Sequence, residues 1–342
     1  MQTSSTITRI DVYAKTQNAL QVAKTLLLKE QLVTARGVPT PAPVQLHFPP
    51  DAQSQSAFDA QAFLARLATQ NLGSTIMTTA ELPSTQTLLH DNASMIPDGT
   101  VCVADRQVMG KGRGHNTWHS PPGCLMFSLL THIKLPGVRL PFVQYVASLA
   151  IVQAVQEQAK ERLQGHEVDV KIKWPNDLYG SKLKIGGILC QSVYRDQAFH
   201  VVIGAGINLS NWQPTTCINE LIDQQHSRLC LPGTASGVAP EALLAAILNN
   251  LERMMGILVK DGFSPMEPAY LQAWLHSGQQ VLLEEEVDGS TRQVQLVVQG
   301  LTPSGYLKAL DQSGQPFELH PDGNSLDFFK GLVRKKVAVP GS

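Results

Sequence analysis

The chain has few charged residues and almost no net charge. Asp, Glu, Lys and Arg make up 16% of its 342 residues, against about 25% in an average soluble domain. The 27 basic and 28 acidic side chains leave a formal charge of −1 at pH 7. Proteins that bind nucleic acid or anionic membranes through bulk charge carry a clear basic excess. We therefore expect neither nucleic acid nor a membrane among the partners.

Long apolar runs and paired cysteines are also missing. No stretch approaches the 18 apolar residues of a membrane span, and the first residues lack the apolar segment of a secretory signal. The five cysteines are scattered without a C-x-x-C pair, which is typical of a reducing compartment. No H-E-x-x-H zinc motif occurs. We expect a cytoplasmic protein, and the start rich in Ser and Thr leaves a plastid or mitochondrial transit peptide as the alternative.

The first 70 residues predict an α/β extension. A strand pattern covers residues 7–13, and a helical period covers residues 18–32. Residues 37–56 hold five prolines and no clear period, which indicates a linker or a surface loop.

Residues 71–275 alternate between strand and helix patterns. Helices are predicted over 144–159 and 240–260, and a half-buried strand over 168–174. Two further strands, at 187–194 and 199–207, are separated by a short turn and predict a hairpin. This alternation favours an α/β or an α+β fold.

The sequence pattern changes near residue 276. Short β-like runs are separated by turn pairs such as Asp-Gly and Ser-Gly, and they predict a small β barrel or sandwich over 276–336. These runs are 280–283, 294–301, 306–310 and 316–320. Residues 337–342 are predicted to be a tail.

The first candidate for chemistry is the run Gly-Lys-Gly-Arg-Gly at 110–114. Its glycines allow main-chain N–H groups to approach a ligand closely, and Lys111 and Arg113 add positive charge suited to a phosphate or a carboxylate. It is not a Walker A loop, because no Ser or Thr follows Lys111. A flexible surface loop is the alternative.

A second run, K-W-P-N-D, ends the predicted strand of the middle part. Asn176 and Asp177 emerge there, where an Asp can bind Mg²⁺ or hold a nucleotide hydroxyl, although an Asn-Asp turn fits the same residues. Lys184 comes just before Gly186 and Gly187 and a strand. It either points into a cleft or is a solvated lysine at a strand start.

A third run is an apolar strand that contains Gly204 and Gly206 and ends at Asn208. Bare backbone there would let a flat ligand lie against the strand, and Asn208 could meet a base or a phosphate. The run is not a dinucleotide fingerprint, because Leu209 stands where the third glycine is needed. A bulged core strand is the alternative.

Taken in order, these runs resemble the catalytic domain of biotin protein ligases. The matching pieces are K-G-R-G-x-N-x-W, S-P-x-G-C, K-W-P-N-D-L-Y, K-I-G-G-I-L and V-I-G-A-G-I-N, followed by P-T-T-C-I-N and L-H-P-D-G-N-S. They are similar above all to eukaryotic, plant-type holocarboxylase synthetases, and the likeness covers residues 75–336. The resemblance implies an α+β fold: a mixed sheet flanked by helices, related to class II aminoacyl-tRNA synthetases, with a C-terminal SH3-like β barrel.

The resemblance also implies the reaction. Biotin and Mg·ATP would give biotinyl-5′-AMP and pyrophosphate, and a lysine of a biotin carboxyl-carrier domain would then attack the mixed anhydride. ATP and Mg²⁺ are the expected cofactors, biotin is the substrate, and the carrier domains of carboxylases are the expected partners.

The biotin site implied by the resemblance comprises Ser84, Thr85, Gln86, Gln107, Lys111, Gly112, Arg113, Lys184, Gly186, Gly187, Gly204 and Gly206. Gln86 stands where the family more often has Asn. Lys111 stands where many members have Arg, so the charge is kept but bidentate contact is lost. On residue type alone, Ser84 and Thr85 favour a helix N-terminus instead.

The implied ATP site comprises Lys111, Arg113, Trp118, Asn176 and Asn208, with Mg²⁺ near the two asparagines. The implied catalytic residues are Lys184, Arg113 and Asp177. Lys184 would contact the biotin carboxyl group and the forming adenylate. Asp177 would orient the reacting groups, including the acceptor lysine.

Three other functions stay open on the sequence. A lipoate–protein ligase would share the fold and the acyl-adenylate chemistry. A biotin-responsive DNA-binding repressor would carry an N-terminal helix-turn-helix, but residues 1–70 show no helix with clustered Lys and Arg. A catalytically inactive biotin-binding module would not need Lys184, Asp177 and Arg113.

Overall fold

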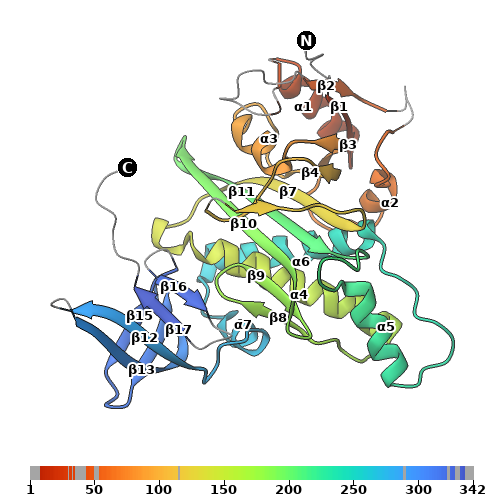
Figure 1. Cartoon of the computed structure of the whole chain (residues 1–342). Coiled ribbons are helices and arrows are strands. Elements are labelled where there is room, and N and C mark those ends of the chain that lie inside the picture. Colours follow the sequence, from red (N-terminus) through yellow and green to blue (C-terminus); the bar gives the residue numbers. More distant parts are fainter. Residues whose placement is uncertain are drawn as a thin grey trace, which may run out of the picture.

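The computed structural model describes residues 8–29, 31–32, 34, 44–49, 54–114, 116–287, 290–321, 324–327 and 332–335. The described chain forms a large sheet with helices on both of its faces and a smaller C-terminal sheet at one end (Figure 1). The predicted α+β class, with a mixed sheet flanked by helices and a small C-terminal β unit, is confirmed.

The large sheet has nine strands in the order β2-β1-β3-β4-β7-β11-β10-β9-β8. Their bounds are β1 Thr8–Ala14, β2 Val44–His47, β3 Thr75–Leu82, β4 Thr100–Gln107, β7 Cys124–Ile133, β8 Val170–Lys173, β9 Asp177–Gly180, β10 Leu183–Arg195 and β11 Ala198–Asn208. The β1–β2 and β3–β4 pairs are parallel, and the other pairs are antiparallel. The sheet is therefore mixed.

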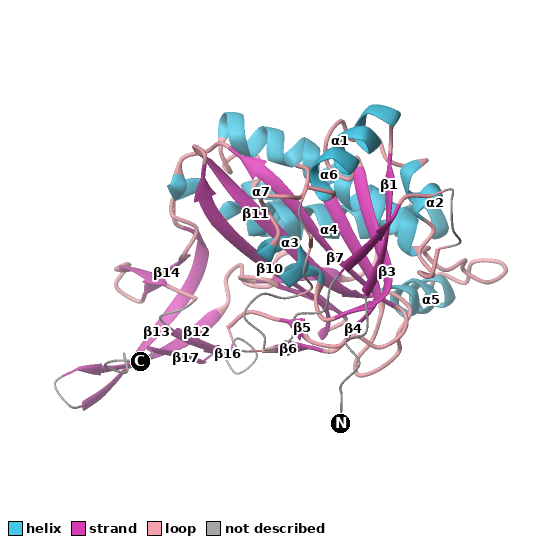
Figure 2. Ribbon diagram, turned by 90° about the horizontal axis from the view of Figure 1, so that it is seen from above, coloured by secondary structure: helices cyan, strands magenta, loops and turns pink. Residues whose placement is uncertain are grey.

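Two long helices, α4 (Phe142–Arg162) and α6 (Pro240–Asp261), pack on one face of this sheet (Figure 2). The opposite face is covered at the β1–β3–β4 end by α1 (Gln17–Leu27) and α3 (Thr85–Asp91). Alternation along the strands decides which face each side chain takes. In β4, Val101 and Val103 pack toward α4, whereas Cys102 and Ala104 pack toward α3.

Shorter helices complete the main unit. They are α2 Ala60–Leu64, the 3-10 turn Gly137–Arg139, α5 Ile218–Arg228 and α7 Glu267–Ala273. Among the described helices, the one over Gly137–Arg162 and the one over Pro240–Asp261 are long and apolar enough to cross a membrane by length and composition. Both lie against the sheet and bury most of their apolar residues, as core helices do.

The C-terminal sheet has six strands in the order β15-β14-β13-β12-β17-β16. Their bounds are β12 Gln280–Val287, β13 Ser290–Leu301, β14 Leu307–Asp311, β15 Pro316–Leu319, β16 Asn324–Asp327 and β17 Leu332–Lys335. All four predicted short runs are strands here. Closure into an SH3-like barrel and the domain limits at residues 70 and 276 stay predictions, and residues 337–342 lie outside the described residues.

The expected linker over 37–56 is wrong in one respect, because β2 lies inside it and pairs in parallel with β1. Val44 and Leu46 are the only apolar pair of this four-residue strand, which is too short to stand out among prolines. The predicted strand over 7–13 is β1, and the predicted helix over 18–32 is α1, which ends at Leu27. Thus β1 and β2 extend the sheet that carries the site.

A hydrogen-bonded junction ties the C-terminal unit to the large sheet. The Trp174 indole donates to the Tyr145 hydroxyl (2.8 Å), which in turn donates to the Gly305 carbonyl oxygen. The Trp174 backbone N–H donates to Nε2 of His276 (2.9 Å). Nε2 must therefore be unprotonated, so the ring proton lies on Nδ1, 2.9 Å from the Gln279 side-chain oxygen.

This junction predicts acid sensitivity. His276 is fully buried, and burial lowers its pKa from 6.5 to about 4, with the Gln279 hydrogen bond only partly opposing the shift. Because the folded state binds the proton more weakly, stability should be full above pH 6.5 and fall as the pH drops toward 4, by roughly 1.4 kcal/mol per pH unit. Urea unfolding at several pH values measures this loss.

The His276→Asn variant is the control for this titration, since an amide does not gain a proton in that range. Its free energy of unfolding should start lower than that of the parent and depend less on pH between 6.5 and 4. Identical slopes in the two proteins would show that the acid loss arises elsewhere.

Candidate active site

A cavity of about 700 Å³ opens on the α3 face of the large sheet, beside strands β7, β10 and β11. Of the predicted site residues, the cavity is lined by Ser84, Thr85, Gln86, Gln107, Lys111, Gly112, Arg113, Trp118, Asn176, Asp177, Lys184, Gly187, Gly204, Gly206 and Asn208. Gly186 does not line it. Residues more than 120 positions apart in the sequence thus meet at one place.

Two glycines of β11 make the floor of the cavity. Alternation turns Gly204, Gly206 and Asn208 to the α3 face, while the residues between them join the core under α4. A Cβ added at Gly204 would overlap the side-chain oxygen of Gln86, and one added at Gly206 would overlap the Trp118 indole. The strand is bare because neighbouring side chains lie directly on it.

The N-terminus of α3 forms one end of the cavity. Ser84 is the N-cap, and its hydroxyl accepts a hydrogen bond from the Thr87 N–H (3.4 Å), so the helix-cap interpretation is confirmed for a residue that also lines the cavity. The Thr85 backbone N–H donates to the Gln107 side-chain oxygen (2.7 Å), and the Thr85 hydroxyl lies 2.8 Å from that of Ser128. This end is therefore a small network of amides and hydroxyls.

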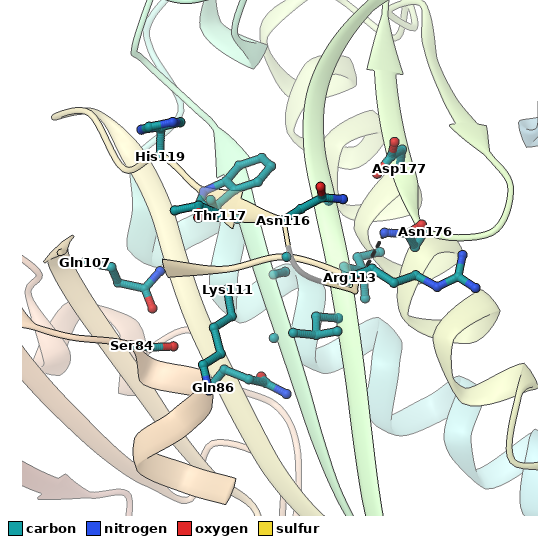
Figure 3. A pocket seen from close by; sticks show the side chains of 18 of the residues that line it. Ser84, Gln86, Gln107, Lys111, Arg113, Asn116, Thr117, His119, Asn176 and Asp177 are labelled. Atoms are coloured by element: carbon teal, nitrogen blue, oxygen red, sulfur yellow. Dashed lines mark hydrogen bonds between the residues drawn. The ribbon is translucent and has the colours of Figure 1, made fainter. Parts of the chain in front are cut away.

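A two-stranded hairpin, β5 (Gly110–Lys111) and β6 (Thr117–Trp118), borders the cavity opposite the floor. Its loop is closed by a bond from the Gly112 N–H to the Asn116 carbonyl (2.8 Å) and turns at Gly114, where φ is +68°. Figure 3 shows Lys111 pointing toward Gln86 and Arg113 reaching the other way, toward Asn176. The two cations thus serve opposite ends of the cavity.

The indole of Trp118 lies on the glycine floor. Gly206 and Gly187 are its neighbours, and the Lys184 Nζ is 5.6 Å from the ring centroid. Trp118 Nε1 is buried without a hydrogen-bond partner in the structure. The ring is therefore held by packing on bare backbone.

The Gly206→Ala variant should displace this ring. The new methyl group would overlap the indole of Trp118. We therefore expect the affinity for biotin, the ligand that the sequence resemblance implies, to fall at least tenfold. Calorimetry on single and double variants measures the effect. In the Trp118→Ala background, Gly206→Ala should weaken binding less than threefold. Equal losses in both backgrounds would show that the methyl group obstructs the ligand itself.

Lys184 and Asp177 form an ion pair at the cavity wall. Lys184 Nζ lies 2.7 Å from the Asp177 carboxylate, and the lysine side chain is 39% exposed. A tight turn with left-handed Ser181 and Lys182 joins β9 to β10, and a register shift between Lys184 and Gly186 lets Asp177 face Gly187. The K-W-P-N-D and K-I-G-G-I-L runs meet through this hairpin.

The two asparagines are held within the protein. Asn208 Nδ2 donates to the Thr215 hydroxyl and the Thr216 carbonyl (3.1 Å each), and its oxygen lies 3.4 Å from the Cys124 thiol. Asn176 Nδ2 donates to the Ile188 carbonyl (3.2 Å). Across the residues that the structure describes, no cluster of three or more His, Cys, Asp or Glu could hold a metal ion.

Several lining residues were not predicted. They include Asn116, Thr117, His119, Ser128, Pro214, Thr215 and Pro321. Asn116, Pro214, Thr215 and Pro321 lie in runs that were matched to the family without being assigned to the site. Ser128 is a polar residue within the apolar run of β7. Pro321, which follows β15, brings the C-terminal unit to the cavity.

Comparisons with known proteins agree on one family. The family model for the biotin/lipoate A/B protein ligase family matches residues 79–208. Biotin–protein ligase 2 of Arabidopsis thaliana is 43% identical over 282 residues, which cover 82% of this chain and 83% of that protein. Biotin–protein ligase 1, chloroplastic, of the same plant is 41% identical over 289 residues, covering 82% and 75%.

Among solved structures, the biotin protein ligase from Aquifex aeolicus in complex with biotin and ATP superposes with a TM-score of 0.52. It is 22% identical, and the match covers 73% of this chain and 96% of that chain. At this identity the likeness concerns the fold. The extent and identity of the plant matches decide the family, and this chain belongs to the biotin–protein ligases.

Proposed function

We propose that the protein activates biotin with Mg·ATP and transfers the biotinyl group to a lysine of a carrier protein. The observation that carries this function is one cavity in which cationic side chains meet a glycine floor and an amide-lined end. Plant biotin–protein ligases at 41–43% identity over most of the chain support the same reaction.

The chemistry brings two anions together. A biotin carboxylate oxygen attacks the α-phosphorus of ATP, an acyl–phosphate bond forms, and pyrophosphate leaves. The amine of the acceptor lysine then attacks the acyl carbon, an amide bond forms, and AMP leaves. Positive groups must offset the repulsion in the first step, and the resulting anhydride must be kept from water.

The residues suit these two steps. Lys184 would contact the biotin carboxylate and the forming adenylate, as the family resemblance implies. Its ammonium group lies at the cavity wall, 2.7 Å from the Asp177 carboxylate and 5.6 Å from the centroid of the Trp118 ring. Arg113 extends toward Asn176 and would bind the phosphates. Lys111 points to the Gln86 end and would contact biotin. The glycine-rich loop would close over the adenylate.

Mg²⁺ would arrive with the nucleotide. Magnesium prefers oxygen ligands and commonly keeps phosphates and waters around it. Asn176 offers an amide oxygen near Arg113, which fits an ion held mainly by the phosphates. We assign Asn208 to holding the 208–216 segment instead, because both ends of its amide already have partners.

The acceptors that we propose are biotin carboxyl-carrier domains of carboxylases. The reaction needs a protein lysine that can enter the cavity.

The location of the protein is a separate question. One plant relative is named as chloroplastic, so a plastid location is as compatible with this chain as a cytoplasmic one.

An ATP–pyrophosphate exchange assay with biotin, and separately with lipoate, tests the proposed function. Exchange that requires biotin, together with labelling of a carrier domain, is the expected result. Exchange with lipoate alone would identify the substrate as lipoate, and no exchange with either acid would overturn the ligase function.

A further inference from the structure

Gln191 lies beside the cavity without lining it. It belongs to β10 and stands directly opposite Val202 of β11. Its side chain is half-buried and points to the α3 face, where its oxygen accepts a hydrogen bond from Gln86 Nε2 (3.1 Å). A strand residue outside the cavity thus contacts a residue that lines it.

The carboxamide of Gln86 has one defined orientation. Its nitrogen also donates to the Val202 carbonyl oxygen (3.1 Å), which can only accept. Both amide hydrogens are therefore used, one by Gln191 and one by Val202. The Gln86 oxygen lies over the bare Cα of Gly204 and accepts from the Ser128 hydroxyl (3.1 Å).

This orientation sets the polarity of the cavity end. The Gln86 oxygen has a second lone pair, so toward a ligand Gln86 is an acceptor and not a donor. Gln107 is turned the opposite way, because its oxygen accepts the Thr85 N–H and leaves its NH₂ group as a donor. A cyclic urea, with N–H groups beside a carbonyl, matches that pair.

We propose that Gln191 is a positioning residue for biotin recognition. Its oxygen holds the Gln86 amide so that the Gln86 carbonyl accepts a ureido N–H of biotin. Without this acceptor, the amide has only one fixed partner for its nitrogen and can rotate to present NH₂ to the ligand N–H. The inference rests on the proposed function, since it assumes biotin in this cavity.

The test compares variants of the 342-residue chain that keep or remove the acceptor. Gln191→Leu and Gln191→Ala remove it, and Gln191→Glu keeps an acceptor at the same length. We expect the first two to raise the KM for biotin about tenfold in pyrophosphate exchange, as the loss of one buried hydrogen bond does. The KM for ATP, kcat and Tm should change little, and Gln191→Glu should lie within threefold of the parent.

Ser192→Ala is the matched control, because Ser192 is the next residue of β10 and is exposed. An unchanged biotin KM in both Leu and Ala variants would overturn the proposal. The proposal would also fail if the KM for ATP rose while kcat and Tm fell in parallel, because that pattern marks a structural role. It would fail too if Gln191→Glu raised the KM for biotin as much as Gln191→Leu does. Failure of the proposed function is a different result, in which the parent protein itself shows no biotin-dependent exchange.

Discussion

The Lys184→Ala variant is expected to form biotinyl-5′-AMP at least a thousandfold more slowly than the parent. Lys184 Nζ lies at the cavity wall, 2.7 Å from Asp177 and over the Trp118 ring. It is the described cation best placed to offset the charge that develops when a carboxylate attacks a phosphate. Removing one preorganised donor to such a charge typically costs about 10²–10³ in rate, and loss of a full positive charge costs more. Single-turnover adenylate formation measures the change.

Lys182→Ala is the matched control for this variant. Lys182 lies two residues earlier, in the turn that precedes β10, is exposed and does not line the cavity. It should keep adenylate formation within about threefold of the parent. Adenylation by Lys184→Ala at a rate close to that of the control would remove Lys184 from the reaction.

Most of the residues that the resemblance implies for the site line the cavity, and several of them come in short runs at strand ends. Asp177 follows a predicted strand, Lys184 precedes one, and in the fold the Gly-x-Gly strand β11 pairs with β10, which pairs with the β9 strand of Asp177. Such runs keep their local structure wherever the chain places them, so their order could be matched to a family. The bare strand was predicted as a surface for a flat ligand, whereas in the structure the side chains of Gln86 and Trp118 lie on Gly204 and Gly206.

What the sequence could not predict depends on contacts between distant strands. Gln191 meets Gln86 only because β10 lies next to β11 and α3 packs against β11, and nothing in its neighbourhood in the sequence indicates that contact. The direction of Lys111 likewise follows from how the hairpin lies across the sheet. β2 was missed because a four-residue strand gains its stability from pairing with β1, not from its own pattern.

In the proposed function, the placement of two cations at opposite ends of the cavity would separate biotin binding from adenylation. Lys111 points to the amide-lined end, whereas Arg113 and Lys184 flank the region of Asn176 and Asp177. A lysine in place of arginine at position 111 would therefore affect the end of the cavity near Gln86, away from the reacting carboxylate and phosphate of the proposed function. We infer that the departure at Lys111 alters biotin affinity more than the rate of adenylation.

The Asp177→Asn variant should separate the two half-reactions. Its amide keeps the size of the side chain but loses the negative charge that faces Lys184. We expect transfer to the acceptor lysine to fall about 10²–10³-fold at neutral pH. That lysine arrives as an ammonium ion, and a carboxylate both attracts the positive charge and accepts a hydrogen bond from the N–H group that must lose its proton. Adenylate formation should fall less than about tenfold, since Lys184 remains. Rapid mixing of preformed adenylate complex with a carrier domain measures the transfer step alone.

The pH profile gives this variant its sharpest readout. An unassisted lysine reacts as the free amine, whose fraction rises up to a pKa of about 10.4, so transfer by Asp177→Asn should climb steeply with pH while that of the parent climbs less. Asp169→Asn is the control, because Asp169 is exposed just before β8 and does not line the cavity. Equal losses in adenylation and transfer, with parallel pH profiles, would assign Asp177 to holding Lys184 and leave the acceptor lysine to another group.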